Sequence, residues 1–273
     1  MKILQLAIEN EIKLIINGGD MLPKLGNRFS DQPAFINEYL RNYFRQLEKN
    51  KIRYLVMLGN DDLLSMDRVL YNLTEEFDNI HYITDRKVNI DGYDFIGMDK
   101  VLDHPFGCKD RVVIEKNYWF RNQLNPYAVI SNDAGYDKIY DWIDYALGKL
   151  PRMNDILYAL PKPIDYKKAI YIMYMPPAHL KLGQLLSRDV DIGSNDIRNF
   201  IEEYQPLLTL HGHFHESPDT STGIWLKRVI KTTCIQPGQT EFGSGKLVYA
   251  EIDLEEGKFS RKKEPILSLC SRS

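Results

Sequence analysis

Three short motifs in this chain carry side chains that can bind a metal ion. Asp20 follows a pair of glycines, Asn60 and Asp61 follow a third glycine, and His213 and His215 flank a phenylalanine. Imidazole is the commonest metal ligand, while carboxylate and amide oxygens suit hard or borderline cations. The residue types therefore indicate a mixed oxygen and imidazole site for manganese, iron or zinc.

Each motif also has a simpler interpretation. An Asp after a strand often caps a helix or ends a turn, and Asn60 with Asp61 is typical of a tight turn. The segment 211–215, which also contains His211, can be a solvated loop or hold a core histidine that is hydrogen-bonded to the backbone. On an extended segment, however, His213 and His215 point the same way, so that two imidazoles can meet neighbouring metal ions.

Each of the three motifs comes directly after an apolar run that predicts a buried strand. These runs are 14–16, 53–58 and 207–210. Helical spacing predicts helices over 3–8, 35–47 and 195–204. Further strands are predicted at 81–84, 95–98 and 169–174, followed by antiparallel strands at 225–230, 232–235 and 247–252. Parallel strands gather their carboxyl ends at one edge of a sheet, which predicts an α/β domain with its site at that edge.

The 273 residues predict one domain over 1–273, with an insertion or cap at about 110–168 that contains a helix over 136–150. The net charge of -3 gives no strong field to attract nucleic acid or an anionic membrane, so we expect neither partner. Three widely spaced cysteines favour a reducing cytoplasm. No stretch approaches the roughly 18 apolar residues of a membrane span. The oligomeric state is left open.

Together, the order and spacing of the three motifs resemble the calcineurin-like metallophosphoesterase family. Pro237 and Gly238 match the turn that follows the site in that family. The resemblance implies a four-layer α/β/β/α sandwich with two divalent metal ions, and hydrolysis of a phosphomonoester or phosphodiester by metal-activated water. It implies the following roles: Asp20 as the bridging carboxylate, Asn60 and His213 as ligands of one metal, His215 as a ligand of the other, and Asp61 where many members have a histidine that assists the leaving group.

Two departures from that pattern bear on the number of metal ions. The family's first strand ends in Asp-x-His, and no such motif precedes Asp20, so the expected sandwich lacks its first strand. Tyr174 stands where members carry a histidine, and His179 is a candidate substitute ligand. A single bound metal ion is therefore the alternative to two.

Three functions follow as hypotheses. The first is a metal-dependent phosphoesterase acting on a small phosphorylated substrate, with nucleotides among the candidates. The second is a binding or scaffold protein on the same fold with a degraded metal site. The third is a nuclease, for which the charge balance offers little counterion release.

Overall fold

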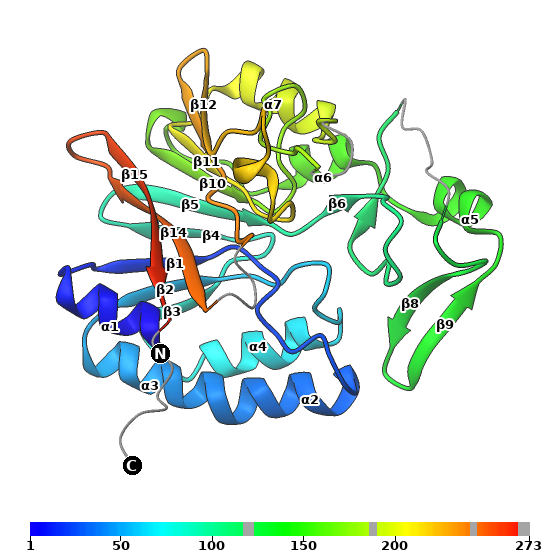
Figure 1. Ribbon diagram of the computed structural model, residues 1–273, viewed down its shortest axis with the longest axis horizontal. Coiled ribbons are helices and arrows are strands. Elements are labelled where there is room, and N and C mark those ends of the chain that lie inside the picture. Colours follow the sequence, from blue (N-terminus) through cyan, green and yellow to red (C-terminus); the bar gives the residue numbers. More distant parts are fainter. Residues whose placement is uncertain (117–122, 186–189, 241–244, 267–273) are drawn as a thin grey trace.

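The chain folds into a mixed α/β structure with several sheets, as the sequence predicts (Figure 1). It is a computed structural model that describes residues 1–116, 123–185, 190–240 and 245–266. Two sheets form its body, and Figure 1 shows helices on the outer side of each. No helix in these described ranges is long and apolar enough to cross a membrane.

The first sheet is parallel, with three strands in the order β1–β2–β3. Their bounds are β1 Leu14–Asn17, β2 Arg53–Val56 and β3 Ile80–Tyr82. The helices beside them are α1 Lys2–Glu9, α2 Arg28–Ala34, the π-helical η1 Phe35–Leu40, α3 Arg41–Lys49 and α4 Met66–Thr74. The predicted opening helix, first strand and second strand are therefore confirmed.

The second sheet has six strands in the order β12–β13–β11–β10–β5–β4. Their bounds are β4 Lys87–Ile90, β5 Tyr93–Met98, β10 Ala169–Met173, β11 Leu208–Leu210, β12 Leu226–Val229 and β13 Thr232–Ile235. The inner four are parallel, and the two outer strands are antiparallel to their neighbours. The helical elements α6 Met153–Ala159, η2 Tyr166–Lys168 and α7 Asn195–Tyr204 accompany this sheet.

Alternating side chains of β2 show how the layers pack. Tyr54 and Val56 lie in a core formed with the helices α1 to α4, whereas Leu55 and Met57 lie in a larger core shared with β5 and β10. Successive side chains of a strand point to opposite faces of its sheet. The first sheet is consequently buried on both faces, which explains the unbroken apolar runs in its sequence.

The inserted segment differs from its prediction in one part. The predicted bounds of about 110–168 contain β7 Val112–Val113, β8 Ala128–Asn132, β9 Gly135–Ile139 and α5 Trp142–Lys149. Before them, β6 Val101–Leu102 pairs with β7. A helix over 136–150 is wrong for its first third, because Gly135–Ile139 pairs with β8 as a hairpin. The turn is set by Asn132, whose side chain accepts a hydrogen bond from the backbone of Ala134. Figure 1 shows this hairpin and α5 beside the body of the molecule.

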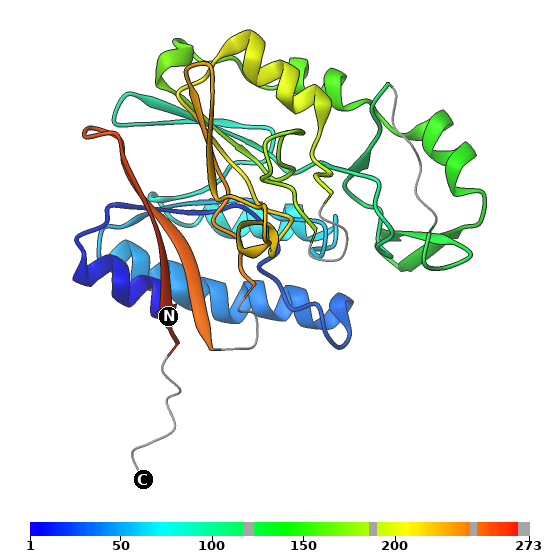
Figure 2. The same cartoon turned by 45° about the horizontal axis from the view of Figure 1, so that its top comes forward.

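The carboxyl-terminal part of the described chain forms a long antiparallel hairpin. It comprises β14 Lys246–Asp253 and β15 Lys258–Pro265, after the short helix η3 Ser217–Asp219. Figures 1 and 2 both show the hairpin crossing beside β1 and α1. Asp219 anchors it through hydrogen bonds from Arg261 and Lys263.

Candidate metal-binding crevice

Five of the predicted site residues meet where strands of the two sheets end. Asp20 follows β1, Asn60 follows β2 and Tyr174 follows β10. His213 and His215 follow β11. All four strands run parallel to their partners within their sheets, so their carboxyl ends bring these side chains together. This group of five residues is called the crevice group, and the place where they meet the crevice.

Tyr174 stands at the centre of this group. Its hydroxyl donates a hydrogen bond to the carboxylate of Asp20 and lies 3.2 Å from Oδ1 of Asn60. Its ring centroid is 5.2 Å from that of His213. Residues that are 154 and 114 positions apart in sequence from Tyr174 are thereby brought to one point.

Two glycines let the chain approach this tyrosine closely. A Cβ added at Gly59 would lie 2.3 Å from Oδ1 of Asp20 and 2.8 Å from Cζ of Tyr174. A Cβ at Gly19 would lie 2.9 Å from the tyrosine ring, and the φ of 125° there is rarely open to other residues. The glycines before Asp20 and Asn60 are therefore required by packing around Tyr174.

Asp20 and His213 both adopt left-handed backbone conformations, with φ of 52° and 67°. Such conformations are uncommon outside glycine and concentrate at functional sites. The extended segment expected at 213–215 is wrong, because the amide of Phe214 donates to the carbonyl of Gly212 across a tight turn centred on His213. The two imidazoles nevertheless both face the crevice group: Nε2 of His215 is 4.0 Å from Oδ2 of Asp20.

The imidazole of His213 has an unsatisfied nitrogen. Within the described parts of the chain, its Nε2 is buried without a hydrogen-bond partner. Burial, followed by the nearby His104 and His215, holds the pKa of His213 well below its ordinary value, so the ring is neutral. A buried polar atom without a partner costs about 1–3 kcal/mol. A neutral imidazole with a bare nitrogen is the form that binds a metal ion.

His211, the third histidine of the motif, has a structural role. Its Nδ1 lies 3.0 Å from the carbonyl oxygen of Met173, and its Nε2 lies 2.8 Å from the hydroxyl of Thr209. Burial lowers its pKa to about 4. The ring is thus neutral and joins β11 to the end of β10, which places Tyr174 beside Gly212.

Carboxylates crowd the floor of the crevice. Burial and then the charge of Asp61 raise the pKa of Asp20, although Tyr174 opposes this through its hydrogen bond. Burial and then Asp20 raise the pKa of Asp62, which accepts hydrogen bonds from the backbone of Gly59 and Leu22. Burial and then Asp20 also raise the pKa of Tyr174 well above its ordinary value. The phenol is therefore protonated, and the carboxylates resist ionisation until a cation offsets their mutual repulsion.

Asp61 and His179, the other two predicted site residues, do not join the crevice group. Asp61 donates its backbone N–H to Oδ1 of Asp20 at 2.8 Å, and its carboxylate turns outward to Lys24 and Arg28. His179 is exposed in a left-handed turn. None of the hydrogen bonds or ring contacts that hold the crevice group together involves His179.

The sequence gives little indication of His104, which lies beside the crevice group, and none of Arg111, which supports it. His104 belongs to the segment 103–106, which follows a predicted strand and is more typical of a turn than of a pocket, yet its ring stacks 5.7 Å from that of His213. Arg111 is absent from the predicted site; it is fully buried and donates from Nε to the carbonyl of Gly59 at 2.7 Å. The position of His104 after a strand could have marked it, whereas nothing near Arg111 in sequence points to a partner 52 residues away.

The donors of the crevice fit one cation better than two. Asp20 and Asn60 offer a carboxylate and an amide oxygen at the hydroxyl of Tyr174, and His213 offers an imidazole beside the tyrosine ring. A second cation would keep only Asp20 and His215 among the described residues, which is too few for firm binding. Across the described ranges, no cluster of three or more His, Cys, Asp or Glu side chains has the geometry of a metal site. The amide of Asn60 is thus needed to complete even one set.

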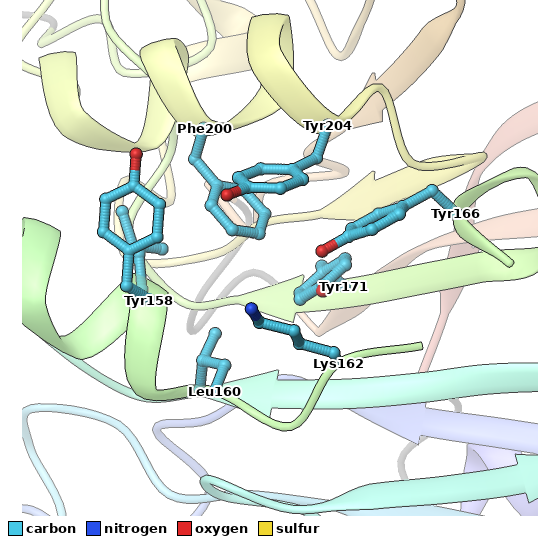
Figure 3. Close-up of a pocket in the computed structure, with 8 residues that line it drawn as sticks. Tyr158, Leu160, Lys162, Tyr166, Tyr171, Phe200 and Tyr204 are labelled. Carbon is cyan, nitrogen blue, oxygen red and sulfur yellow. The ribbon is translucent and has the colours of Figure 1, made fainter. Parts of the chain in front are cut away.

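Two hollows elsewhere in the described chain share no residue with the crevice group. A cavity of about 10 Å³ lies among aromatic side chains of α6, α7 and β10, including Tyr158, Tyr171 and Tyr204, around Lys162 (Figure 3). It has room for about one water molecule. An open groove of about 470 Å³ is lined by His81, Arg86 and other residues of α4, β3 and β4.

Comparison with solved structures supports the fold. One crystal structure matches with a TM-score of 0.58 and 18% sequence identity, covering 96% of this chain and 92% of the other. The crystal structure of the protein TT1561 of Thermus thermophilus matches with a TM-score of 0.54 and 16% identity, covering 96% of this chain and 90% of that one. No family model matches this sequence. No curated protein matches it either.

Proposed function

We propose that the crevice hydrolyses a phosphoester of a small molecule with the help of one divalent cation held by Asp20, Asn60 and His213. The buried Nε2 of His213 has no hydrogen-bond partner in the described chain and carries this proposal, because its ring lies 5.2 Å from the ring of Tyr174. The hydroxyl of that tyrosine contacts the carboxylate of Asp20 and the amide oxygen of Asn60. The motif order that resembles the calcineurin-like metallophosphoesterases supports it, as does the position at strand ends. The four-layer sandwich of that family is part of the same proposal.

The residues of the chain prepare the crevice in separate ways. Asp20 supplies the charge, and its carboxylate is oriented by the backbone N–H of Asp61. Asn60 is placed by the tight approach of Gly59 to Asp20. His215, with a side chain 36% exposed, reaches the solvent side of Asp20, where a substrate would enter. A bound divalent cation supplies Lewis-acid activation of water and of the phosphoryl oxygen.

A second candidate is a binding protein that uses the crevice without catalysis. The hydrogen bond from Tyr174 to Asp20 favours it, because a protonated phenol already satisfies this carboxylate and contacts Asn60. The crevice is then stable with no cation. For hydrolysis, the tyrosine hydroxyl has to give up this hydrogen bond when a cation binds.

Calorimetric titration with manganese and an assay with an aryl phosphate distinguish the two candidates. We expect the wild-type chain to bind one manganese ion and to hydrolyse the ester, and Asp20→Ala and His213→Ala to lose both properties. His81→Ala, a histidine of the distant groove, is the matched control and retains both. Folded wild-type protein that takes up no manganese and hydrolyses nothing would establish the binding-protein candidate instead.

A further inference from the structure

Two basic side chains lie at the outer edge of the crevice, beside Asp61. Lys24 and Arg28 both belong to the segment between β1 and the start of α2. Nζ of Lys24 is 3.2 Å from Oδ2 of Asp61, and Nη2 of Arg28 is 3.8 Å from Oδ1 of the same carboxylate. Their side chains are 39% and 22% exposed, against 25% for Asp61. All three charges are thus within reach of solvent and of a ligand.

The segments that carry these charges are fixed by buried polar contacts. Gln32, fully buried, donates to the carbonyls of Pro23 and Asp61 and accepts from the amide of Leu63. Asp62, also buried, accepts from the amide of Leu22. The backbones on either side of the ion pairs are therefore locked together, and only the side chains need to move to exchange one anion for another.

A phosphorylated substrate needs positive charge at this edge. The carboxylates of Asp20 and Asp62 are largely buried, that of Asp61 lies at the outer edge, and burial together with their mutual repulsion raises the pKa of Asp20 and of Asp62. Arg111 cannot help, because its fully buried guanidinium is engaged by Asp67, Asp99 and the carbonyl of Gly59. Lys24 and Arg28 are the cations that this arrangement leaves at the surface.

We propose that Lys24 and Arg28 form a subsite for a dianionic phosphoryl group, with the carboxylate of Asp61 holding the two cations in place until the substrate arrives. The planar guanidinium suits two phosphoryl oxygens, and the ammonium suits a third. The subsite selects a phosphomonoester over a phosphodiester, whose phosphate carries only one negative charge. That the bound anion is a phosphate rests on the proposed function. That Lys24 and Arg28 can exchange the carboxylate of Asp61 for another anion does not.

The inserted hairpin forms one wall of this subsite. The ring of Phe29, next to Arg28, packs edge-on against Tyr136 of β9 with centroids 4.9 Å apart. Arg28 also lies close enough to Tyr136 to oppose the rise that burial causes in the pKa of that tyrosine. The guanidinium therefore lies between Asp61 and the insertion, which restricts the size of what is attached to the phosphoryl group.

Binding of inorganic phosphate to the full chain, measured by calorimetry without added metal, tests the subsite. We expect Asp61→Asn to bind phosphate about tenfold more tightly than wild type, because the carboxylate that competes with phosphate for both cations is removed. Arg28→Gln weakens binding about tenfold, and adding Arg28→Gln to Asp61→Asn removes the gain. Glu202→Gln is the matched control: it releases Arg198 from an ion pair on α7, with the same change in net charge.

The results separate the subsite from the proposed function. An equal gain in Glu202→Gln, or no gain in folded Asp61→Asn, overturns the subsite. If the expected pattern holds while no variant hydrolyses an ester, the subsite stands and the hydrolytic function fails. If hydrolysis occurs, Arg28→Gln lowers kcat/KM for an aryl phosphomonoester more than for the corresponding diester, and an equal loss on both contradicts the selection.

Discussion

Two clusters of buried polar groups in the described chain, one around Arg111 and one in the crevice, differ in how completely they are paired. Around Arg111, each charge has an opposite charge: the guanidinium contacts Asp67 and Asp99. In the crevice, a buried nitrogen of His213 lacks any partner in the described chain. Complete pairing is what stability requires, whereas a buried polar atom without a partner leaves a position that a ligand can fill.

The two clusters are connected, which makes the comparison useful. Arg111 donates to the carbonyl of Gly59, the residue before Asn60. Burial opposes the charge of Arg111, but Asp99 and Asp67 outweigh it and raise its pKa. The guanidinium thus stays charged and holds the loop that brings Asn60 to the crevice.

The largest effect is expected from Arg111→Met. It leaves the fully buried carboxylate of Asp99 without this partner, and breaking such a pair costs about 3–5 kcal/mol. Urea unfolding followed by circular dichroism measures the loss. Arg41→Met, which removes an exposed pair with Glu76, is the control and costs less than about 1 kcal/mol. Equal losses would show that the Arg111 cluster is no more structural than the surface.

Tyr174→His is expected to have an intermediate effect, on cation binding instead of stability. The imidazole adds a nitrogen donor beside Asp20 and Asn60 and removes the phenol that competes for Asp20. We expect manganese to bind at least about tenfold more tightly, a change of about 1.4 kcal/mol, by calorimetry. Tyr174→Phe is the control, since it removes the hydroxyl without adding a donor. If Tyr174→His binds no better than Tyr174→Phe, the crevice group is not a set of cation ligands.

The smallest effect is expected at a third cluster, which is exposed. Asp219 binds Arg261, Lys263 and Thr240, and the hydrogen bond from Arg261 is the first cause of its lowered pKa. Because the pKa of Asp219 is lowered in the folded state, its ionised carboxylate stabilises the fold at pH values above the unfolded pKa of about 3.9. This stabilisation is lost as the pH falls further. Asp219→Asn should cost about 0.5–1 kcal/mol at pH 7.

Thermal unfolding at several pH values checks this expectation. The difference between wild type and Asp219→Asn should shrink as the pH falls below about 3.9. Glu256→Gln, which removes an exposed pair with Lys258 on the same hairpin, should differ from wild type less at pH 7. A difference for Asp219→Asn that grows on acidification would contradict the assignment.

The sequence predicts the strands and the crevice for one physical reason. Strands buried on both faces are continuous apolar runs, so the runs before Asp20 and Asn60 mark β1 and β2 clearly. Their polar ends then necessarily meet at a sheet edge. The same reasoning finds β10, β11 and α7, whose bounds agree with the prediction to within a residue or so.

Other features depend on contacts that local sequence does not record. The sequence predicts helix for the hairpin strand Gly135–Ile139, since its alternation is short and its partner β8 decides its conformation. The left-handed turn at His213 and the closeness of Tyr174 to Asp20 both depend on the packing of two sheets. The pairing of Arg111 with Gly59 spans 52 residues and has no local signal.

The nitrogen of His213 tests the central claim most directly. The chain has six histidines, so long-range proton–nitrogen NMR spectra can resolve each ring during a titration with zinc. We predict that Nε2 of His213 shifts on zinc binding while His211, satisfied on both nitrogens, does not. Zinc that binds elsewhere and leaves the His213 signals unchanged would contradict the account.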